Sequence, residues 1–220
     1  MRVPKILIVA ATAFEIDTVL KTFKIETDTS CGLYAGSHNV SALITGVGMV
    51  NTAYYLGRHS HAEFDIIINA GICGAVNLSL KIGEVVDVVS DTLSELGAEN
   101  DADFISFKDL NLGGTSLYLP KNTSNMATLK SLKKVNAITV NKVHGNTESI
   151  KKMIALHNPD IETMEGAAFF RGTEHMQAKC LQIRSVSNYV QKRDKSKWNV
   201  PLAIRNLNNF VIQLIKTINS

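Results

Sequence analysis

The sequence predicts an α/β fold, in which helices flank a mixed, mainly parallel central sheet. First, apolar segments of strand length alternate along the chain with longer segments of helical periodicity. Second, several of the short segments are continuously apolar, as expected for strands that are buried on both faces of a sheet. Third, the 220 residues contain no internal repeat or low-complexity tract and are enough for one sizeable core. We therefore assign residues 1–220 to a single domain.

The first predicted strand is Lys5–Ala11, and a helix follows because the apolar residues between positions 16 and 23 have helical spacing. Thr12 is suited to cap this helix, and Glu15, three residues later, would complete a capping box. Alternatively, Glu15 faces the edge of the sheet where α/β proteins bind ligands. The local pattern alone favours the cap. The two roles partly exclude each other, because a carboxylate bonded to the cap is less free to orient water.

Two glycine-rich segments each follow a predicted strand. The strand Val40–Thr45 is closed by Gly46-Val47-Gly48, before a helix from about Met49 to His59, and the strand Asp65–Ala70 runs into Gly71-Ile72-Cys73-Gly74-Ala75. The first segment lacks the third glycine and the acidic partner of a dinucleotide fingerprint. Each segment alone is ordinary turn chemistry. Two of them, side by side at the carboxyl ends of parallel strands, predict a shared pocket.

The middle of the chain is less regular. Glu84–Ser90 is a β-rich run, whereas residues 91–134 are polar and predict irregular connection and surface, such as a lid or an oligomer contact. Ala137–Val143 is a further strand, which leads into a helix over about residues 147–156. The last helix runs from about Trp198 to Ile218 and has one buried apolar stripe.

The segment Ile161–Asp194 organises the rest of the chain. Glu165 stands at the start of a helix that runs through about Gln177, where the helix dipole favours a carboxylate. Small residues follow it and let a ligand approach the backbone. Cys180–Ser187 is a buried strand, and Asn188 lies just past its end, at the ligand-binding edge of the sheet. The segment thus supplies a carboxylate suited to a diol and an amide suited to a heterocycle.

The composition excludes several classes of function. With 45% hydrophobic and 20% charged residues, the chain is globular rather than disordered. The net charge of +3 is small, and no basic cluster is interleaved with aromatic residues, so we expect no nucleic-acid partner. The apolar segments are too short for a signal peptide or a membrane span, so we expect a cytoplasmic protein without a membrane partner.

Neither a metal nor another cofactor is expected. The histidines are scattered, and His59 and His61 lack the carboxylates of a metal motif. Walker loops and Gly-x-Ser-x-Gly elbows are absent from the sequence. The three cysteines are far apart and odd in number, which indicates reduced residues of a cytoplasmic protein. For Cys73, packing is favoured over a reactive thiol.

Five motifs in order make the chain resemble the nucleoside phosphorylase and nucleosidase superfamily. They are the Glu after the first strand, Thr-Gly-Val-Gly at 45–48, Asn-Ala-Gly-Ile-Cys-Gly at 69–74, Met-Glu-Gly-Ala-Ala at 164–168 and Arg-Ser-Val-Ser-Asn at 184–188. These motifs span nearly the whole chain. The resemblance implies a nucleoside phosphorylase-like fold, a small-molecule purine nucleoside as the substrate, and a homo-oligomer (a dimer or larger).

The resemblance also implies roles for individual residues. Met164 and Glu165 would bind the ribose, with the Glu165 carboxylate accepting hydrogen bonds from the 2′- and 3′-hydroxyls. Gly71 and Ile72 would line the base and the sugar, and Ser187 would belong to the substrate-binding set beside the base.

Hydrolysis is favoured over phosphorolysis. Phosphorylases of the superfamily hold phosphate with arginines near the first strand and near the glycine-rich strand end, where this chain has Ala-Thr-Ala-Phe-Glu and Ile-Asn-Ala-Gly. By resemblance to the hydrolytic branch, Glu15 is the general base that takes a proton from water. Positioned proton transfer typically contributes ~10²–10⁴-fold. The purine would depart through a ribosyl oxocarbenium-like state.

The leaving base is expected to contact Asn188, which is therefore a second candidate catalytic residue. Relatives that act on methylthioadenosine and adenosylhomocysteine carry Asp there, whereas a neutral amide both donates and accepts, which suits the 6-oxo and N7 edge of hypoxanthine. With the run that follows, Asn188 makes the chain similar to the futalosine hydrolase family, which releases hypoxanthine from futalosine in menaquinone biosynthesis. Lys192 and Arg193 are candidates for binding the substrate's carboxyphenyl group, although surface cations are more often only solvated.

Two alternatives stay open. One is a methylthioadenosine/adenosylhomocysteine nucleosidase that releases adenine. The other is a non-catalytic nucleoside-binding protein that has kept the pocket.

Overall fold

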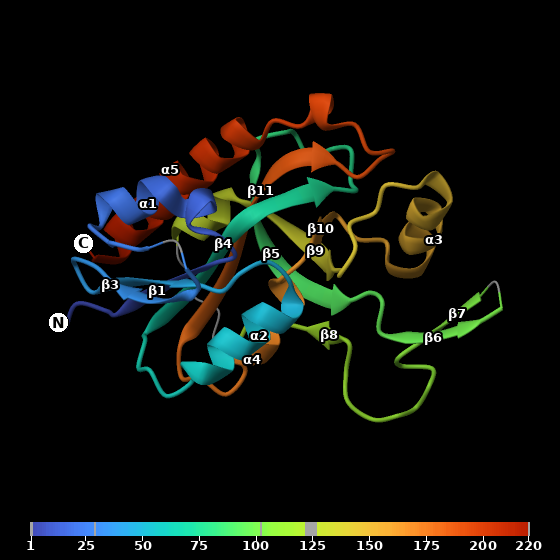
Figure 1. Ribbon diagram of the computed structural model, residues 1–220, viewed down its shortest axis with the longest axis horizontal. Helices are drawn as coiled ribbons and strands as arrows, with labels where there is room; N and C mark the ends of the chain where they lie inside the picture. The colour runs from blue at the N-terminus through green and yellow to red at the C-terminus, as the bar shows by residue number, and fades with distance from the viewer. Residues whose placement is uncertain (1, 29, 102, 122–126, 220) are drawn as a thin grey trace.

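The computed structural model describes residues 2–28, 30–101, 103–121 and 127–219. Its centre is a nine-stranded mixed sheet in the order β10-β9-β5-β11-β4-β1-β3-β2, with β8 paired to β5 (Figure 1). The strands are β1 (Ile6–Ala10), β2 (Gly32–Ala35), β3 (Val40–Ile44), β4 (Ile66–Ala75), β5 (Val85–Leu93), β8 (Leu117–Tyr118), β9 (Lys133–Thr139), β10 (Ile161–Thr163) and β11 (Lys179–Tyr189). The pairs β1–β3, β1–β4, β4–β11, β5–β9 and β9–β10 are parallel, which confirms the predicted mainly parallel, mixed sheet.

Helices cover both faces of the sheet (Figure 1). On one face lie α1 (Asp17–Thr22), which follows the 3₁₀-helix η1 (Ala13–Ile16), and α5 (Val200–Asn219). On the other face α2 (Met49–Arg58) packs against α4 (Gly166–Thr173). The remaining helical segments are α3 (Thr147–His157), η2 (Ala127–Ser131) and η3 (Lys195–Lys197).

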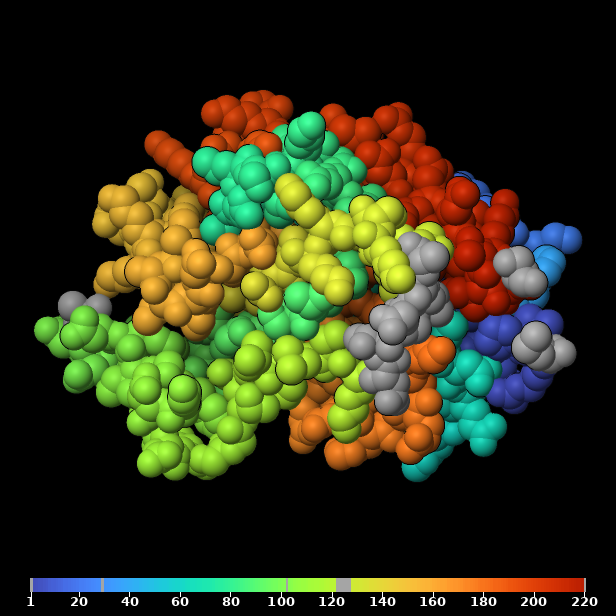
Figure 2. Space-filling view, turned by 180° about the vertical axis from the view of Figure 1, so that it is seen from behind, coloured from blue at the N-terminus to red at the C-terminus, as the bar shows by residue number. Residues whose placement is uncertain are grey.

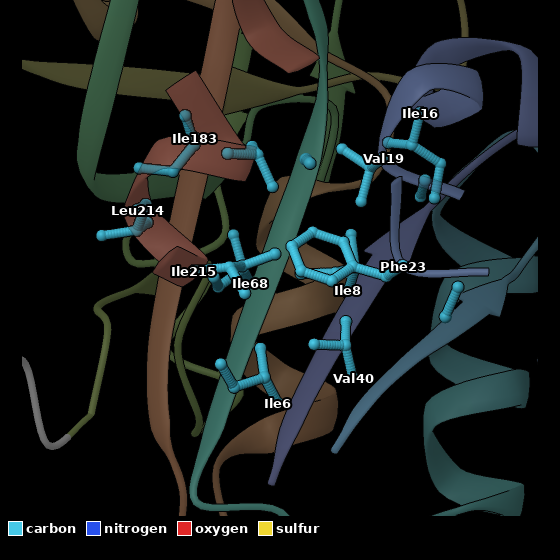
Figure 3. Packing of buried hydrophobic residues seen from close by; sticks show 14 of the residues in the cluster. Ile6, Ile8, Ile16, Val19, Phe23, Val40, Ile68, Ile183, Leu214 and Ile215 are labelled. Atoms are coloured by element: carbon cyan, nitrogen blue, oxygen red, sulfur yellow. The ribbon is translucent and has the colours of Figure 1, made fainter. Parts of the chain in front are cut away.

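The first strand shows why the sheet is buried on both faces. Ile6 and Ile8 pack in the cluster that includes side chains of α1 and α5, as Figure 3 shows. Leu7 and Val9, which point the opposite way, pack in the cluster that includes side chains of α2 and α4. All four side chains are buried. The continuous apolar run therefore follows from helices on both sides.

Two strands continue through residues that were predicted to lie outside them. β4 does not end at Ala70 but runs to Ala75, because β10 pairs with its glycine-rich part from one side and β11 from the other. β11 likewise includes Asn188, with a register shift between Val186 and Asn188. A shift of this kind re-aims the side chain that follows it. The predicted loops are thus the ends of the two central strands.

Other boundaries also differ from the prediction. α4 ends at Thr173 rather than near Gln177, and β9 begins and ends earlier than the predicted strand over residues 137–143. The short strands β2 and β10 were not predicted. β10 has only three residues, which is too short for a periodic pattern.

The prediction of irregular structure for residues 91–134 is wrong in part. This segment contains the end of β5, the two-stranded sheet of β6 (Gly97–Asn100) and β7 (Asp103–Ser106), the strand β8 and the start of β9. Figure 2 shows the part around β6 and β7, in green, at one edge of the molecule. Residues 102 and 122–126 of the segment lie outside the described residues.

Candidate active site

A cavity of about 410 Å³ opens where the carboxyl ends of β1, β4, β10 and β11 meet the start of α4. Six of the residues that the sequence singled out line it: Glu15, Ile72, Met164, Glu165, Ser187 and Asn188. They come from segments that are far apart in the chain and are brought together by the strand order β11-β4-β1. The carboxylates of Glu15 and Glu165 therefore share one cavity.

Glu15 combines the two roles that the sequence left as alternatives. Its Oε2 accepts hydrogen bonds from the backbone N and the Oγ1 of Thr12, both at 3.2 Å, and its own backbone N donates to Thr12 Oγ1 at 3.4 Å, which completes the capping box. Its Oε1 accepts from the backbone N of Ile72 at 3.2 Å. One oxygen thus fixes the carboxylate, and the other lies beside β4 in the cavity.

The electrostatics around Glu15 suit proton transfer. Burial raises the pKa of the Glu15 carboxyl above its usual 4.5, and the negative charge of Glu165 raises it further. The positive charge of Arg184 and the hydrogen bonds from Ile72 and Thr12 act in the opposite direction. A carboxylate whose pKa is moved toward neutrality is a more effective general base than an ordinary surface glutamate.

Glu165 is the residue that immediately precedes α4, and its side chain caps none of the helix amides. Its Oε1 accepts a hydrogen bond from the backbone N of Gly48 at 3.0 Å. Gly46 and Gly48 both have positive φ, at 81° and 97°, so the Gly-Val-Gly turn needs glycine at these two places. The turn thereby brings a backbone donor to the carboxylate, and Val47 to the cavity wall.

Threonine hydroxyls satisfy the first amides of α4 in place of Glu165. The Gly166 amide donates to Thr163 Oγ1 at 3.3 Å, and the Ala167 amide donates to Thr139 Oγ1 at 2.8 Å. Thr139 in turn donates to the buried carboxyl of Asp91 at 2.7 Å. Because the helix start is held from behind, the Glu165 carboxylate is available to a ligand.

Asn188 lies on β11 with its amide fixed by neighbours. Ser187 Oγ lies 2.8 Å from Asn188 Oδ1 and 3.1 Å from the carbonyl oxygen of Cys73, and Asn188 Nδ2 donates to the carbonyl oxygen of Tyr189 at 3.1 Å. An amide nitrogen carries two hydrogens. The second N–H of Asn188 is therefore a donor that remains for a ligand in the cavity.

Arg184 belongs to the motif at 184–188 but was given no role of its own from the sequence, and it lies behind Glu15. Arg184, on β11, is only 2% exposed, and its Nη2 donates to Asn69 Oδ1 on β4. Gly71 does not line the cavity; it makes room for Arg184, because a Cβ at this position would overlap Nη1 and lie 3.2 Å from Glu15 Oε1. The glycine-rich strand end thus does have an arginine beside it, contributed by a neighbouring strand. Arg184 is not among the lining residues, however.

Other polar residues also line the cavity, and two of them, His144 and Glu162, form a contacting pair that was not predicted. His144 follows β9, and Glu162 lies on β10; the Glu162 side chain accepts a hydrogen bond from the His144 backbone N at 3.0 Å and contacts His144 Nδ1. Hydrogen bonding to Glu162 raises the pKa of His144, although burial opposes this. The only sequence signal was their position next to predicted elements, which is weak.

Among the other candidates, burial raises the pKa of the Cys73 thiol to about 12, so this cysteine is a poor nucleophile. Arg193 lines the cavity with its guanidinium 5.2 Å from the centroid of the Trp198 ring, and Lys192 is not among the lining residues. Within the described residues, no group of three or more His, Cys, Asp or Glu side chains is placed to hold a metal ion. None of the described helices has the length and apolar character needed to cross a membrane.

The sheet, its two helical layers and a cavity with two carboxylates at the strand ends define a protein of the nucleoside phosphorylase-like α/β class. The chain belongs to the Phosphorylase superfamily, whose sequence model matches residues 5–216.

Relatives and solved structures agree with this family. The chain is 27% identical to the futalosine hydrolase of Thermus thermophilus over 179 residues, which cover 79% of this chain and 80% of that protein. The futalosine hydrolase of Helicobacter pylori strain 26695 has a TM-score of 0.82 at 16% identity and covers 98% of both chains. A 5′-methylthioadenosine/S-adenosylhomocysteine nucleosidase of Colwellia psychrerythraea, in complex with adenine, has a TM-score of 0.82 at 17% identity, covering 99% of this chain and 96% of that one. At such identities the structural likeness shows the fold alone.

Proposed function

We propose that this protein is an N-ribosyl hydrolase that cleaves the N-glycosidic bond of futalosine and releases hypoxanthine. The observation that carries the proposal is the convergence of Glu15 and Glu165 in one cavity, from η1 and from the start of α4. The futalosine hydrolases among its relatives, from Thermus thermophilus and Streptomyces coelicolor, support the choice of substrate.

In the proposed reaction, Glu165 accepts hydrogen bonds from the ribose 2′- and 3′-hydroxyls while Met164 packs against the sugar. Glu15, with its raised pKa, takes a proton from the attacking water. As the bond to the base lengthens, positive charge develops on the ribosyl ring, and the negative charges of the two carboxylates stabilise it. The free N–H of Asn188 donates to the departing purine.

Water rather than phosphate is the proposed nucleophile. A phosphate dianion would meet the charges of Glu15 and Glu165, which line the cavity. The buried Arg184 lies close enough to lower the pKa of Glu15, but it is bonded to Asn69 and is not among the lining residues. Its charge therefore acts on Glu15 rather than on an anionic substrate.

The alternative of a methylthioadenosine/adenosylhomocysteine nucleosidase differs at the base. The two solved structures above have equal TM-scores, so the fold does not separate the two activities. Incubation of the protein with futalosine, methylthioadenosine and adenosylhomocysteine, followed by chromatography of the released base, separates them. We expect hypoxanthine from futalosine. Adenine release with futalosine untouched would overturn our choice, and tight binding without any turnover would indicate a nucleoside-binding protein.

The remaining parts of the proposal concern context. We place the reaction in menaquinone biosynthesis in the cytoplasm and treat residues 1–220 as one nucleosidase domain. We also propose a homo-oligomer, a dimer or larger, because apolar side chains are exposed near the cavity: Phe14 (68%) and Val47 (52%) on its lining, and Val50 (76%) and Tyr54 (57%) on α2. Sedimentation equilibrium would measure the oligomeric state, and a monomer at all concentrations would contradict this part.

A further inference from the structure

We propose that Glu162, held in place by His144, accepts a hydrogen bond from N1–H of a 6-oxopurine and thereby determines which purine the cavity takes. This inference rests on the proposed function, since it assumes that the cavity binds a purine. It assigns a role to a pair of residues that neither the proposed water activation nor the ribose contacts use.

The first observation is the position of Glu162 in the sheet. Glu162 on β10 is the register partner of Gly74 on β4, and Gly74 is in turn the register partner of Asn188 on β11. The three residues form one row across three neighbouring strands. Residues opposite each other in a sheet point to the same face, and neighbouring strands are about 4.8 Å apart. Glu162 and Asn188 thus flank Gly74 on the face that lines the cavity.

The glycine in this row is required by its neighbours. A Cβ at position 74 would lie 2.9 Å from Val190 Cγ2 and 3.4 Å from Asn188 Nδ2, so a side chain there would displace Val190 and crowd the amide of Asn188. With glycine, the space between the carboxylate and the amide stays free of a third side chain from the row. A flat heterocycle placed over this row would have the carboxylate at one end and the amide at the other.

The second observation is the orientation of the carboxylate. The Glu162 residue is only 5% exposed, and both of its oxygens contact His144: one accepts from the backbone N at 3.0 Å, and the other contacts Nδ1. Each carboxylate oxygen has a further lone pair. Because the contacts to His144 fix the group, Glu162 presents the remaining acceptor capacity to the cavity that it lines.

The charges around His144 favour this arrangement. Glu162 and Glu95 raise the pKa of His144, whereas Lys142 and burial lower it; His157 is the other titratable group that senses its charge. The hydrogen bond to Glu162 is the largest of these influences. The contact with the imidazole gives the Glu162 carboxylate a partner in a buried site, where an unpaired charge would be costly.

The chemistry of the base then gives discrimination. A 6-oxopurine carries N1–H, a donor, whereas a 6-aminopurine has an unprotonated N1, an acceptor. A carboxylate, which only accepts hydrogen bonds, would bind N1–H of the 6-oxopurine. Its lone pairs would repel the lone pair on N1 of the 6-aminopurine. Sites built to hydrogen-bond a ligand N–H reject analogues that lack it, because the buried polar group is then left unpaired. Asn188 does not provide this selection at N1, because its amide can both donate and accept.

The direct test uses free bases as ligands of the wild-type protein. We expect hypoxanthine to bind at least ~10-fold more tightly than either adenine or 1-methylhypoxanthine in isothermal titration calorimetry, because both analogues lack N1–H. Adenine adds no bulk at N1, so it controls for the size of the methyl group. Equal affinity for hypoxanthine and 1-methylhypoxanthine would overturn the inference.

The variant Glu162→Gln sharpens the test. The amide of glutamine can donate to N1 of adenine as well as accept from hypoxanthine, so the preference for hypoxanthine over adenine should fall at least ~10-fold. The control Glu148→Gln, on the exposed first turn of α3, should keep the wild-type ratio. An unchanged ratio in Glu162→Gln would contradict the inference, and the wild-type titrations decide it if this variant does not fold.

Different results would contradict the proposed function and the role of Glu162. If the proposed function is wrong, the protein releases no hypoxanthine from futalosine, whichever purines it binds. If only the role of Glu162 is wrong, futalosine is still hydrolysed, but the binding of bases does not depend on N1–H.

Discussion

Acidic side chains lie on either side of the start of α4, and the two sides differ in access to a ligand. In front, Glu15 and Glu165 line the cavity. Behind, Asp91 is fully buried and is sealed by hydrogen bonds from Thr139 at 2.7 Å and Gln182 at 3.0 Å. A Cβ on Gly166 would overlap Asp91 Oδ2, so the backbone of α4 closes directly over it.

Burial raises the pKa of a carboxyl on both sides. In front it raises the pKa of Glu15, and behind it raises the pKa of Asp91 to about 6. A perturbed pKa therefore does not by itself identify a catalytic group in this protein. What separates the groups is that the front carboxylates keep lone pairs directed at a cavity, whereas the rear carboxyl is enclosed by the protein. The rear group shapes the helix start from which Glu165 acts. Four measurements test this difference between the two sides.

The largest effect is expected for Glu15→Gln. The change keeps the shape of the side chain but removes the base, so kcat for futalosine hydrolysis should fall by ~10²–10⁴-fold. In the wild type, kcat should fall at acid pH as Glu15 is protonated, with a midpoint above 4.5 because the pKa is raised. Steady-state kinetics across pH would show both, and a variant with wild-type kcat would remove Glu15 from the mechanism.

A smaller loss is expected for Glu165→Gln. Hydrogen bonds from the ribose hydroxyls to a charged acceptor become bonds to a neutral amide, so kcat/KM should fall by ~10–100-fold. Substrates without the 2′-hydroxyl should be affected less, because one of these bonds is already missing. Equal losses for the ribosyl and 2′-deoxyribosyl forms of one nucleoside would contradict the assigned contact.

For Asp91, behind the start of α4, we expect an effect on the free energy of unfolding rather than on catalysis. Asp91 has a pKa of about 6 when folded and about 3.9 when unfolded. Between these values the folded state binds more protons, so the free energy of unfolding decreases as pH rises and levels off above the folded pKa. Asp91→Asn removes this slope, which is worth at most ~3 kcal/mol. Within the described residues Gln182 Oε1 has no hydrogen-bond partner, and it can accept from the new amide if the Gln182 amide group flips. Denaturant unfolding between pH 4 and 7 would measure the free energy of unfolding of the wild type and of Asp91→Asn. The same dependence on pH in both proteins would contradict the prediction.

The smallest expected effect concerns Cys73, which lines the cavity but has a pKa of about 12. Its thiol should not react with iodoacetamide at pH 8, whereas the exposed Cys31 should react. Mass spectrometry of tryptic peptides would locate the label, and Cys73→Ala should keep kcat within ~3-fold. Rapid loss of activity on alkylation of Cys73 would show that it is more accessible than the structure indicates.

Sequence patterns predicted the front group better than the rear group. Glu15 and Glu165 stand next to strong strand and helix signals, so their places at the sheet edge could be predicted. Sequence alone did not show that each oxygen of Glu15 has a separate partner, because the Ile72 amide comes from another strand. Nor did it show that Arg184 lies behind Glu15, since an arginine is not expected to be buried within a strand of this kind.

The rest of the site depends on tertiary pairing that leaves little local signal. β4 continues through its glycines only because two other strands pair with them, and pairing of this kind overrides local propensity. Glu162 lies on the three-residue strand β10, where no alternation can be read. The network that joins Asp91, Thr139 and Gln182 comes from three strands that are distant in the sequence, so only the fold reveals it.

In the proposed mechanism, the cavity-facing carboxylates direct water, and not phosphate, to the anomeric carbon of a purine nucleoside. The most direct measurement is the hydrolysis of futalosine in ¹⁸O-labelled water with excess inorganic phosphate, with mass spectrometry of the sugar product. The proposed mechanism predicts hypoxanthine and a sugar that carries one ¹⁸O at the anomeric carbon. A sugar 1-phosphate, or no released base, would contradict it.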